Sequence, residues 1–415
     1  MKYRMIFLSA LDIWSMKDGV GAPSFYKTLS LYIQKGHDVI LIKPNGKKHK
    51  DYKIEGLKEI TFNYDFLDSL LSIRYISFFS RILIALYQRY KYYSIASSLI
   101  ESSCLPCIVY AYEVSGVFAA RKLHLKYFVP FITRFQGTVL GGVANNWLNR
   151  LRYFPHFQAL EQESNLVIMT DDGTKGDAVL KQLGNQSEQI KFWKNGVSAL
   201  TNSRKFNDSD LGQFRKIYRQ KYNLGENTIV LMTLCRLAYW KRIDRAIVAL
   251  EGVIKVHRDV KLIIVGDGSE KENLLQLCKV KQLSNFVVFV GGIKQKDTVY
   301  YYAMCDIFLS LYDLSNVGNP LLEALVYGKV ILTLNTGDTA SVINNGINGV
   351  VVPVNQLSEI ASAINNLIEN EDFRKKLSDG AKLYARYNLW TWEKRMEIEY
   401  NVVMNVADKY YTTQV

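Results

Sequence analysis

The sequence predicts an α/β protein with two domains, each built on a parallel sheet. Two segments of the C-terminal half, VKLIIVGDGSEKENLLQL and NFVVFVGGIKQKDTVYYYAMCDIFLSLY, each place a β-branched run before glycine and a polar helix start. Repeated alternation of strand and helix patterns is typical of a parallel sheet. A chain of 415 residues is too long for one ordinary core, and its 48% hydrophobic content is sufficient for two.

The N-terminal half shows the same alternation. The strands expected there are, in order, IFLSAL, DVILIK, CIVYAY, YFVPFITRFQGT and LVIMT. The helices expected among them are FYKTLSLYIQ, a helix from about Ser115, WLNRLRYFPHFQALEQES and GDAVLKQL. The stretch up to Leu70 is expected to be extended, and the polar residues 201–220 are expected to link the two domains.

Residues 74–93, RYISFFSRILIALYQRYKYY, have the pattern of a basic amphipathic helix. One side gathers Tyr75, Phe79, Ile82, Leu83, Leu86, Tyr90 and Tyr93, and the other gathers Arg74, Ser77, Arg81, Gln88 and Arg89. Such a helix either lies in an anionic headgroup layer or packs its apolar side on the sheet with its arginines solvated. The sequence leaves both alternatives open.

A site for a nucleoside diphosphate is predicted from two segments of the C-terminal half. In SLYDLSNVGNPLLEALVYG, a loop with glycine joins a strand to a helix for which Asn319 suits the cap and Pro320 the first position. The N–H groups of that helix end can bind an anion, and Glu323 can accept hydrogen bonds from ribose hydroxyls. In TIVLMTLCRLAYWKRIDRAIVAL, Arg236 and Lys241 place two cations on a loop that opens a helix, as a phosphate clamp requires.

Five motifs in order, RLAYWKRIDRAI, IIVGDGSE, FVGGI, GNPLLEALVYGKVILT and INNGINGVVV, resemble the donor domain of the GT-B glycosyltransferases, specifically the retaining family 4 type (glycosyl transferases group 1). More loosely, DGVGAPSFYKTLSLYIQKGHDVILI is similar to the start of the family's first domain. The resemblance implies two Rossmann-like domains facing a central cleft. An acceptor-binding domain is expected at residues 1–200, a nucleotide-sugar donor domain at 201–387, and a helix at 388–415 that packs back on the first domain.

The resemblance also implies roles for individual residues. Arg236 and Lys241 match the family's diphosphate-binding pair, and Glu323 matches the second glutamate of its E-x7-E motif, which is assigned to the nucleotide ribose. The simpler alternatives are an exposed basic loop and a carboxylate that stabilises the helix dipole. The remaining residues expected to bind the donor are Gly19, Gly21, Asn195, Gly268, Ser315, Asn316, Gly318, Asn319, Pro320 and Leu321.

The chain departs from the family at Ser315, which stands where the first glutamate of the E-x7-E motif is usual, and at Asn316, which replaces glycine. In the family that carboxylate lies close to the donor sugar. Three alternatives follow. Ser315 and Asn316 hydrogen-bond the sugar themselves, which we favour; Asp313 reaches the sugar; or the protein is a catalytically weak subunit that acts as a scaffold or regulator.

The mechanism that the resemblance implies is transfer with retention at the anomeric carbon. The leaving diphosphate helps to deprotonate the incoming hydroxyl, so the protein supplies positive charge and positioning, and no metal is implied. Where many relatives carry a histidine, TRFQGT places Gln136 or Arg134, and Gln136 can donate a hydrogen bond to a sugar hydroxyl but cannot act as a base. Glu113 is a candidate for holding the acceptor, with a simple helix start as the alternative.

The net charge of +13 implies anionic partners, and no nucleic-acid-binding motif is present. The resemblance implies no cofactor and a nucleotide-diphosphate sugar as the donor substrate, a UDP-sugar in preference to a GDP-sugar. The basic charge and the amphipathic helix favour a glycan or lipid-linked acceptor, as in bacterial surface polysaccharide biosynthesis. No apolar run reaches the ~18 to 20 residues of a spanning helix, so a cytoplasmic protein, able to bind peripherally to the inner face of the plasma membrane, is expected.

Other classes of site and protein are disfavoured. The five cysteines suggest no disulfide framework, and the lone CxxC of Cys104 and Cys107 lacks further zinc ligands, so buried structural thiols and no metal site are expected. Sugar-nucleotide 2-epimerases share the architecture but use carboxylates and histidines, and the five histidines here stand in no pocket motif. A dinucleotide oxidoreductase needs a third glycine and an acidic ribose ligand, which GDGSE lacks.

Overall fold

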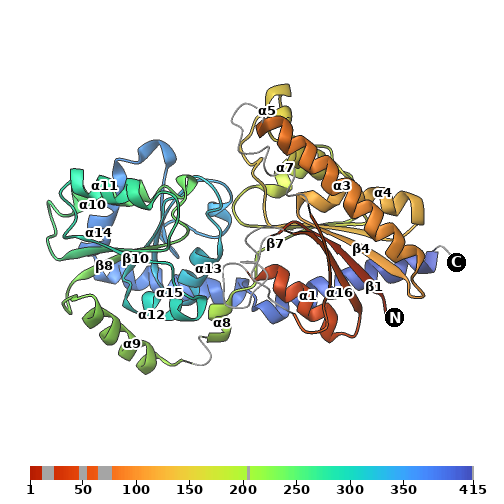
Figure 1. The fold of residues 1–415 in the computed structure, drawn as a ribbon. Helices are drawn as coiled ribbons and strands as arrows, with labels where there is room; N and C mark the ends of the chain where they lie inside the picture. The colour runs from red at the N-terminus through yellow and green to blue at the C-terminus, as the bar shows by residue number, and fades with distance from the viewer. Residues whose placement is uncertain (12–22, 46–53, 64–76, 203–205, 414–415) are drawn as a thin grey trace. The chain divides into compact units, whose positions relative to one another are not determined.

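The computed structural model describes residues 1–11, 23–45, 54–63, 77–202 and 206–413 of the 415-residue chain. The chain forms two units, each built on one parallel sheet (Figure 1). The first unit contains Met1–Asp171, Lys175–Lys194 and Trp392–Val415, and the second contains Asp172–Thr174 and Asn195–Thr391.

The sheet of the first unit has seven strands in the order β3-β2-β1-β4-β5-β6-β7. Their bounds are β1 (Arg4–Leu8), β2 (Asp38–Pro44), β3 (Lys58–Phe62), β4 (Cys107–Tyr112), β5 (Phe131–Phe135), β6 (Leu166–Thr170) and β7 (Ile190–Trp193). Strands β4, β5 and β6 are buried along their whole length, as expected for parallel strands with helices on both faces. β1 pairs with both β2 and β4, so the strand order reverses there.

Helices cover both faces of this sheet (Figure 1). On one face lie α3 (Ser77–Glu101), α4 (Val114–Tyr127), α6 (Phe154–Leu160) and α7 (Gly176–Gln182), which share a core with β1, β4 and β5. On the other face α1 (Ser24–Gln34) packs beside the C-terminal helix α16 (Trp392–Thr413). The chain therefore returns to its first unit at its end, as expected for the C-terminal helix of this fold.

The sheet of the second unit has six strands in the order β10-β9-β8-β11-β12-β13. Their bounds are β8 (Ile229–Leu234), β9 (Val260–Val265), β10 (Val287–Gly291), β11 (Ile307–Ser310), β12 (Val330–Leu334) and β13 (Val350–Val352). β8 pairs with β9 on one side and β11 on the other, so the strand order reverses between β8 and β11. In open α/β sheets, ligands bind outside the carboxyl ends of the strands at this reversal.

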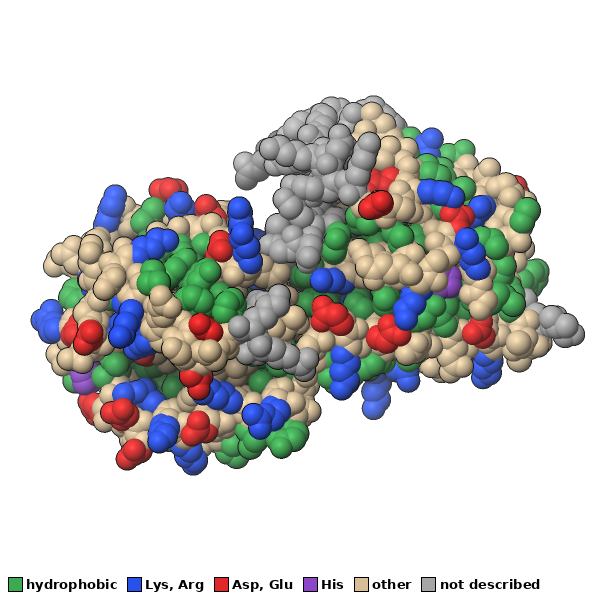
Figure 2. All heavy atoms as spheres, turned by 90° about the horizontal axis from the view of Figure 1, so that it is seen from below, with side chains coloured by type: hydrophobic (Ala, Val, Ile, Leu, Met, Phe, Trp, Pro, Cys, Tyr) green, Lys and Arg blue, Asp and Glu red, His purple; other side chains and the backbone are tan. Residues whose placement is uncertain are grey.

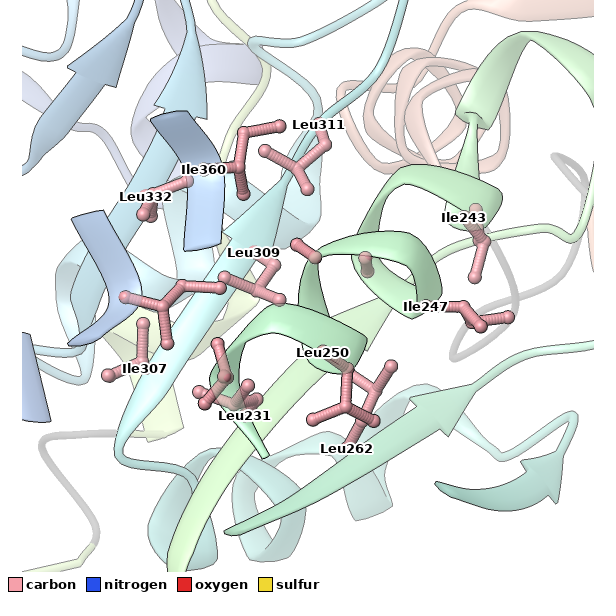
Figure 3. Packing of buried hydrophobic residues seen from close by; sticks show 14 of the residues in the cluster. Leu231, Ile243, Ile247, Leu250, Leu262, Ile307, Leu309, Leu311, Leu332 and Ile360 are labelled. Carbon is pink, nitrogen blue, oxygen red and sulfur yellow. The ribbon is translucent and has the colours of Figure 1, made fainter. Parts of the chain in front are cut away.

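Two apolar cores, one on each face, hold the second sheet between its helices. The first is formed with α10 (Ile243–Val253), α11 (Lys271–Val280) and α14 (Glu359–Glu369), and Figure 3 shows Ile247 and Leu250 of α10 packing over Leu231, Leu262 and Leu309 of the strands. The second is formed with α8 (Ser198–Asn202), α9 (Asp208–Lys221), α12 (Thr298–Met304), α13 (Asn319–Val326) and α15 (Glu371–Asn388). Short 3-10 turns η2 (Tyr239–Lys241), η3 (Gln295–Asp297), η4 (Thr339–Ser341) and η5 (Val354–Gln356) complete this unit.

Several local expectations are refined or corrected. Within the stretch that was expected to be extended, residues 58–62 form a paired edge strand, β3. Much of the expected link at residues 201–220 is helix α9, which begins with a capping box between Asn207 and Asp210. The helix expected over WLNRLRYFPHFQALEQES is divided into α5 (Trp147–Arg152) and α6, because Pro155 stands at the start of the second and cannot continue the first.

Side-chain exposure bears on two further expectations. In α3, Leu83, Leu86 and Tyr90 are exposed, whereas Tyr92 and Ala96 are fully buried. Cys104 is exposed and only Cys107 of the CxxC pair is buried, because Cys104 precedes β4. Lys and Arg side chains are interspersed with Asp and Glu on the face shown in Figure 2.

Candidate functional site

The candidate site of the second unit lies at the carboxyl ends of β8 and β11, where the strand order reverses. The loop after β8 carries Arg236 and Lys241, and the loop after β11 carries Ser315 and leads into α13. The sequence separates these loops by about eighty positions, and the pairing of β8 with β11 brings them to one edge of the sheet. The structure therefore groups the cationic residues with the start of α13, as a diphosphate site requires.

Backbone contacts fix the position of Arg236. The Cys235 N–H donates to the Val265 carbonyl and the Leu237 N–H to the Asp267 carbonyl, each with an N···O distance of 3.0 Å. Gly268 has a φ of +159°, and a Cβ there would lie 2.4 Å from the Leu237 carbonyl oxygen. Gly268 is needed for this close approach of two backbones. The Arg236 side chain between the two fixed residues is exposed.

Lys241 connects the two loops. Its Nζ donates to the carbonyls of Ser315 over 3.1 Å and Leu314 over 3.4 Å, and lies 4.3 Å from the centre of the Tyr312 ring. Burial lowers the pKa of the Lys241 amine, against the opposing influence of Cys235 and Asp172. Lys241 therefore places a positive charge directly beside the backbone of Ser315.

Asp313 is occupied by two arginines. Its carboxylate oxygens pair with Arg245 over 2.6 Å and with Arg242 over 3.2 Å. Arg242 has a φ of 44° and also pairs with Asp244 over 2.8 Å. The Asp313 carboxylate thus anchors the loop after β11 to the start of α10.

Ser315 and Asn316 have different surroundings. Ser315 has a φ of 58°, in the left-handed region, and its Oγ donates to Oδ2 of Asp172 over 2.9 Å. Asn316 is only 1% exposed, and its Nδ2 donates to the Tyr312 carbonyl over 2.9 Å and to Thr336 Oγ1. The amide nitrogen of Asn316 is thus used within the unit, whereas the Ser315 hydroxyl is oriented by a carboxylate that is distant in sequence.

The start of α13 differs by one position from the expected cap. Gly318 is the N-cap, with φ −76° and ψ 168°, so Asn319, Pro320 and Leu321 are the first three helical residues. Among the described residues, Oδ1 of Asn319 is buried without a hydrogen-bond partner. Pro320 has no N–H and the Leu321 N–H donates to the Gly318 carbonyl over 3.0 Å, so in the first turn the glycine cap leaves the Asn319 N–H without a side-chain acceptor from the cap.

Glu323 lies in α13 and is 4% exposed. Burial raises the pKa of its carboxyl to about 7, although side-chain hydrogen bonds from Gln295, Tyr302 and Thr298 act in the opposite direction. Near neutral pH this carboxyl is therefore divided between its neutral and ionised forms. It can donate or accept a hydrogen bond depending on pH.

In the first unit, the structure brings together two residues predicted from the sequence. The Gln136 N–H donates to Oε1 of Glu113 over 2.6 Å, and Nε2 of Gln136 lies 3.5 Å from the Tyr112 hydroxyl. Both residues directly follow strands, β5 and β4, at the carboxyl edge of the sheet. Arg134, the alternative to Gln136, is fully buried and pairs with Glu399, so its place is in the interior.

The remaining predicted residues and one unpredicted residue complete the site. Asn195 lies in the second unit, where its Oδ1 is buried with no hydrogen-bond partner in the described part of the chain. Gly19 and Gly21 lie outside the described residues. Asp172 was not predicted, and the signal that could have identified it is its place just after the carboxyl end of β6.

The described ranges contain no cluster of His, Cys, Asp and Glu suited to a metal ion. Across those ranges, no helix combines the length and the apolar character that crossing a bilayer would require.

Comparison with known proteins places these features in context. The family model described as "Glycosyl transferases group 1" matches residues 214–384. N-acetyl-alpha-D-glucosaminyl L-malate synthase of Bacillus anthracis is 26% identical over 49% of this chain and 53% of its own length. Alpha-monoglucosyldiacylglycerol synthase of Streptococcus pneumoniae is 30% identical over 28% of this chain and 26% of its own length.

These matches span about half or less of the curated relatives. The structure of Anabaena HepE in complex with UDP-glucose resembles this one with a TM-score of 0.65 at 17% identity, over 99% of both chains. This likeness establishes the fold as two Rossmann-like domains of the GT-B type.

Proposed function

Because the model of the glycosyl transferases group 1 family matches residues 214–384, we propose that the chain is a glycosyltransferase that uses a nucleotide-diphosphate sugar. The acceptor is a hydroxyl of a glycan or a lipid-linked glycan, and the anomeric configuration is retained. The observation that carries the proposal is the grouping of Arg236, Lys241 and the glycine-capped start of α13 at the reversal of the strand order.

The proposed reaction breaks the bond between the anomeric carbon and the diphosphate oxygen and forms a bond to the acceptor oxygen. The acceptor proton passes to the departing diphosphate, which gains negative charge. Arg236, Lys241 and the N-terminal end of α13 stabilise that charge, and they do so without requiring a metal ion. In the second unit, Glu323 accepts hydrogen bonds from the ribose. In the first unit, Gln136 and Glu113 offer hydrogen-bonding groups for the acceptor.

A UDP-sugar is the donor we favour over a GDP-sugar, because the similar HepE structure holds UDP-glucose. For the acceptor, a lipid-linked glycan at an anionic membrane surface is supported by exposed apolar side chains on two neighbouring helices. Those residues are Leu83, Leu86 and Tyr90 on α3, and Trp147, Leu148 and Leu151 on α5. Ile82 and Leu151 line one hollow, which places the two helices side by side. Transfer to such an acceptor would suit a role in bacterial surface polysaccharide biosynthesis.

The test is thermal unfolding of the protein with UDP, GDP and their sugars. A ligand that binds only the folded state at 100 times its dissociation constant adds about 2.7 kcal/mol to the free energy of unfolding. We expect one nucleotide to stabilise the protein, and Arg236→Ala and Lys241→Ala each to weaken its binding roughly ten- to a hundredfold, as expected for a lost charge-assisted contact.

Lys279→Ala is the matched control, because Lys279 is an exposed cation on α11 of the same unit. It should bind the nucleotide as the parent protein does. If no nucleotide or nucleotide sugar stabilises the folded protein, the transferase proposal is wrong, and a scaffold role, suggested by Ser315 in place of glutamate, becomes the better account.

A further inference from the structure

Asp172 contacts the loop that carries Ser315, although the two residues are 143 positions apart in the chain. Besides the 2.9 Å hydrogen bond from Ser315 Oγ to Asp172 Oδ2, the Val317 N–H donates to the Asp172 carbonyl over 3.0 Å. Two hydrogen bonds of Asp172, one from its backbone and one from its side chain, thus hold residues 172–174 against the loop after β11. Both partners belong to the second unit.

The backbone next to Asp172 packs closely against the loop after β11. Gly173 has a φ of +92°, and a Cβ there would lie 2.8 Å from the Val317 nitrogen and 2.9 Å from the Asn316 nitrogen. A Cβ on Gly337 would lie 1.9 Å from the Gly173 carbonyl oxygen. Two glycines are therefore required for the approach of this segment, so the contact between Asp172 and Ser315 is a built feature.

The hydrogen bonds define how Asp172 affects Ser315. Thr174 donates to the other carboxylate oxygen, Oδ1, from its hydroxyl over 2.6 Å and from its N–H over 3.2 Å. Oδ2 therefore stays directed at the Ser315 hydroxyl. Because the Ser315 hydroxyl donates its hydrogen bond to the Asp172 carboxylate, the lone pairs of its oxygen are available to accept a hydrogen bond from a third group. The neighbouring negative charge strengthens that second bond.

The position of Lys241 indicates which group donates a hydrogen bond to the Ser315 oxygen. Lys241 Nζ lies 3.1 Å from the Ser315 carbonyl, so a phosphate bound by Lys241 must lie close to Ser315. The sugar is bonded directly to that phosphate, which brings its hydroxyl groups near the Ser315 side chain. Burial raises the pKa of Asp172, whereas the bonds from Thr174 and Ser315 and the charge of Lys241 lower it.

We propose that Asp172 and Ser315 act as a pair in place of the glutamate that the loop lacks, with Ser315 Oγ accepting a hydrogen bond from a hydroxyl of the donor sugar and Asp172 positioning that oxygen. This inference rests on the proposed function. It assigns Asp172 as a positioning residue and implies a preference for donors whose sugar presents a hydroxyl there. It also accounts for the loss of glutamate without loss of the sugar contact.

The test compares the binding of UDP with that of UDP-glucose and UDP-N-acetylglucosamine by calorimetry, in the full chain. Asp172→Asn and Ser315→Ala should each weaken binding of at least one UDP-sugar roughly tenfold or more and leave UDP binding unchanged. The double variant should be no weaker than the worse single variant, because both changes remove the same acceptor.

Asp379→Asn, an exposed carboxylate on α15, is the matched control and should bind UDP and the UDP-sugars as the parent does. The thermal unfolding of each variant establishes that it is folded. A loss of UDP and UDP-sugar binding in equal proportion, additive losses in the double variant, or unchanged sugar binding would each overturn the proposed pair. Failure of the parent protein to bind any nucleoside diphosphate or nucleotide sugar would instead overturn the proposed function, so the two failures are distinguishable.

Discussion

At the scale of single residues, Glu323 is a candidate site residue in an environment that disfavours the charged form of its carboxyl. The carboxyl is 4% exposed and its pKa is raised by burial to about 7 from an ordinary value of 4.5. Between these two values the folded protein holds a proton that the unfolded chain has released. The folded state therefore loses stability as the pH rises from about 4.5 through about 7.

This predicts the behaviour of Glu323→Gln. Glutamine has the same shape as glutamate and does not titrate in this range. We therefore expect the stability of the variant to stay constant between pH 5 and pH 8, apart from the titration of other groups. At pH 8 it should be more stable than the parent by about 2 to 3 kcal/mol, while at pH 5 the difference should be small. Thermal unfolding at the two pH values measures both quantities. Parallel pH profiles for the two proteins would contradict the raised pKa.

The residues of the site differ in how far the sequence could predict them. Arg236, Lys241 and Ser315 lie in loops whose strand and helix neighbours are evident from the sequence, and the structure brings these loops together. Asp172 could not be linked to Ser315, because a contact across 143 positions depends on the tertiary packing of Gly173 and Gly337. Likewise, the burial of the Asn316 amide follows from its bonds to Tyr312 and Thr336, which no local pattern encodes.

At the scale of elements, the buried central strands could be predicted from the sequence, whereas the edge strand β3 could be predicted less well. β4, β5 and β6 are buried along their whole length because both faces are covered, and all but two or fewer residues of each strand are apolar or aromatic. β3 is mostly exposed and polar, with the sequence KEITF, so its pairing with β2 leaves little hydrophobic signal. Helix α9 has a low apolar content, but its capping box between Asn207 and Asp210 was a usable local signal.

Helix α3 shows why periodicity alone could not decide which side is buried. The helix carries apolar side chains around much of its circumference, and the packing chooses Tyr92 and Ala96 for the core. Arg89 lies over the rings of Phe118 at 4.5 Å and Phe154 at 5.3 Å, so an arginine expected in solvent is packed against apolar neighbours. Leu83 and Leu86, each 48% exposed, remain on the surface.

The exposed side of α3 predicts membrane association. We expect the protein to sediment with vesicles that contain phosphatidylglycerol and less with vesicles of phosphatidylcholine alone, because the chain carries a net charge of +13. The double variant Leu83→Ser and Leu86→Ser should lower the binding to anionic vesicles roughly tenfold or more, since two apolar side chains no longer enter the headgroup layer.

Leu125→Ser is the matched control for this measurement, because Leu125 is 60% exposed and lies on α4 rather than on α3 or α5. Its binding should equal that of the parent protein. Absence of vesicle binding by the parent, or an equal loss in the control, would contradict a membrane role of α3.

At the scale of the whole molecule, α16 joins the end of the chain to its first unit. Glu399 of α16 is buried with a side chain 1% exposed, and it pairs with Arg395 over 2.8 Å and with Arg134 of β5. The Tyr110 hydroxyl donates to the same carboxylate over 2.8 Å. Burial alone would raise the pKa of Glu399, but the charges of Arg134 and Arg395 hold it below its ordinary value. Two buried cations thus share one carboxylate.

Loss of that carboxylate should act on one unit only. Glu399→Gln leaves two buried guanidinium groups without a counter-charge, which costs about 3 to 5 kcal/mol of unfolding free energy. Because each unit has its own apolar cores, we expect calorimetry to show a lower transition for the first unit and an unchanged one for the second, which still shifts upward with UDP. Glu397→Gln, which removes an exposed partner of Lys35, is the control and should leave the unfolding of the first unit nearly unchanged. Equal effects of the two variants, or a loss of the UDP shift in Glu399→Gln, would show that α16 does not act within the first unit alone.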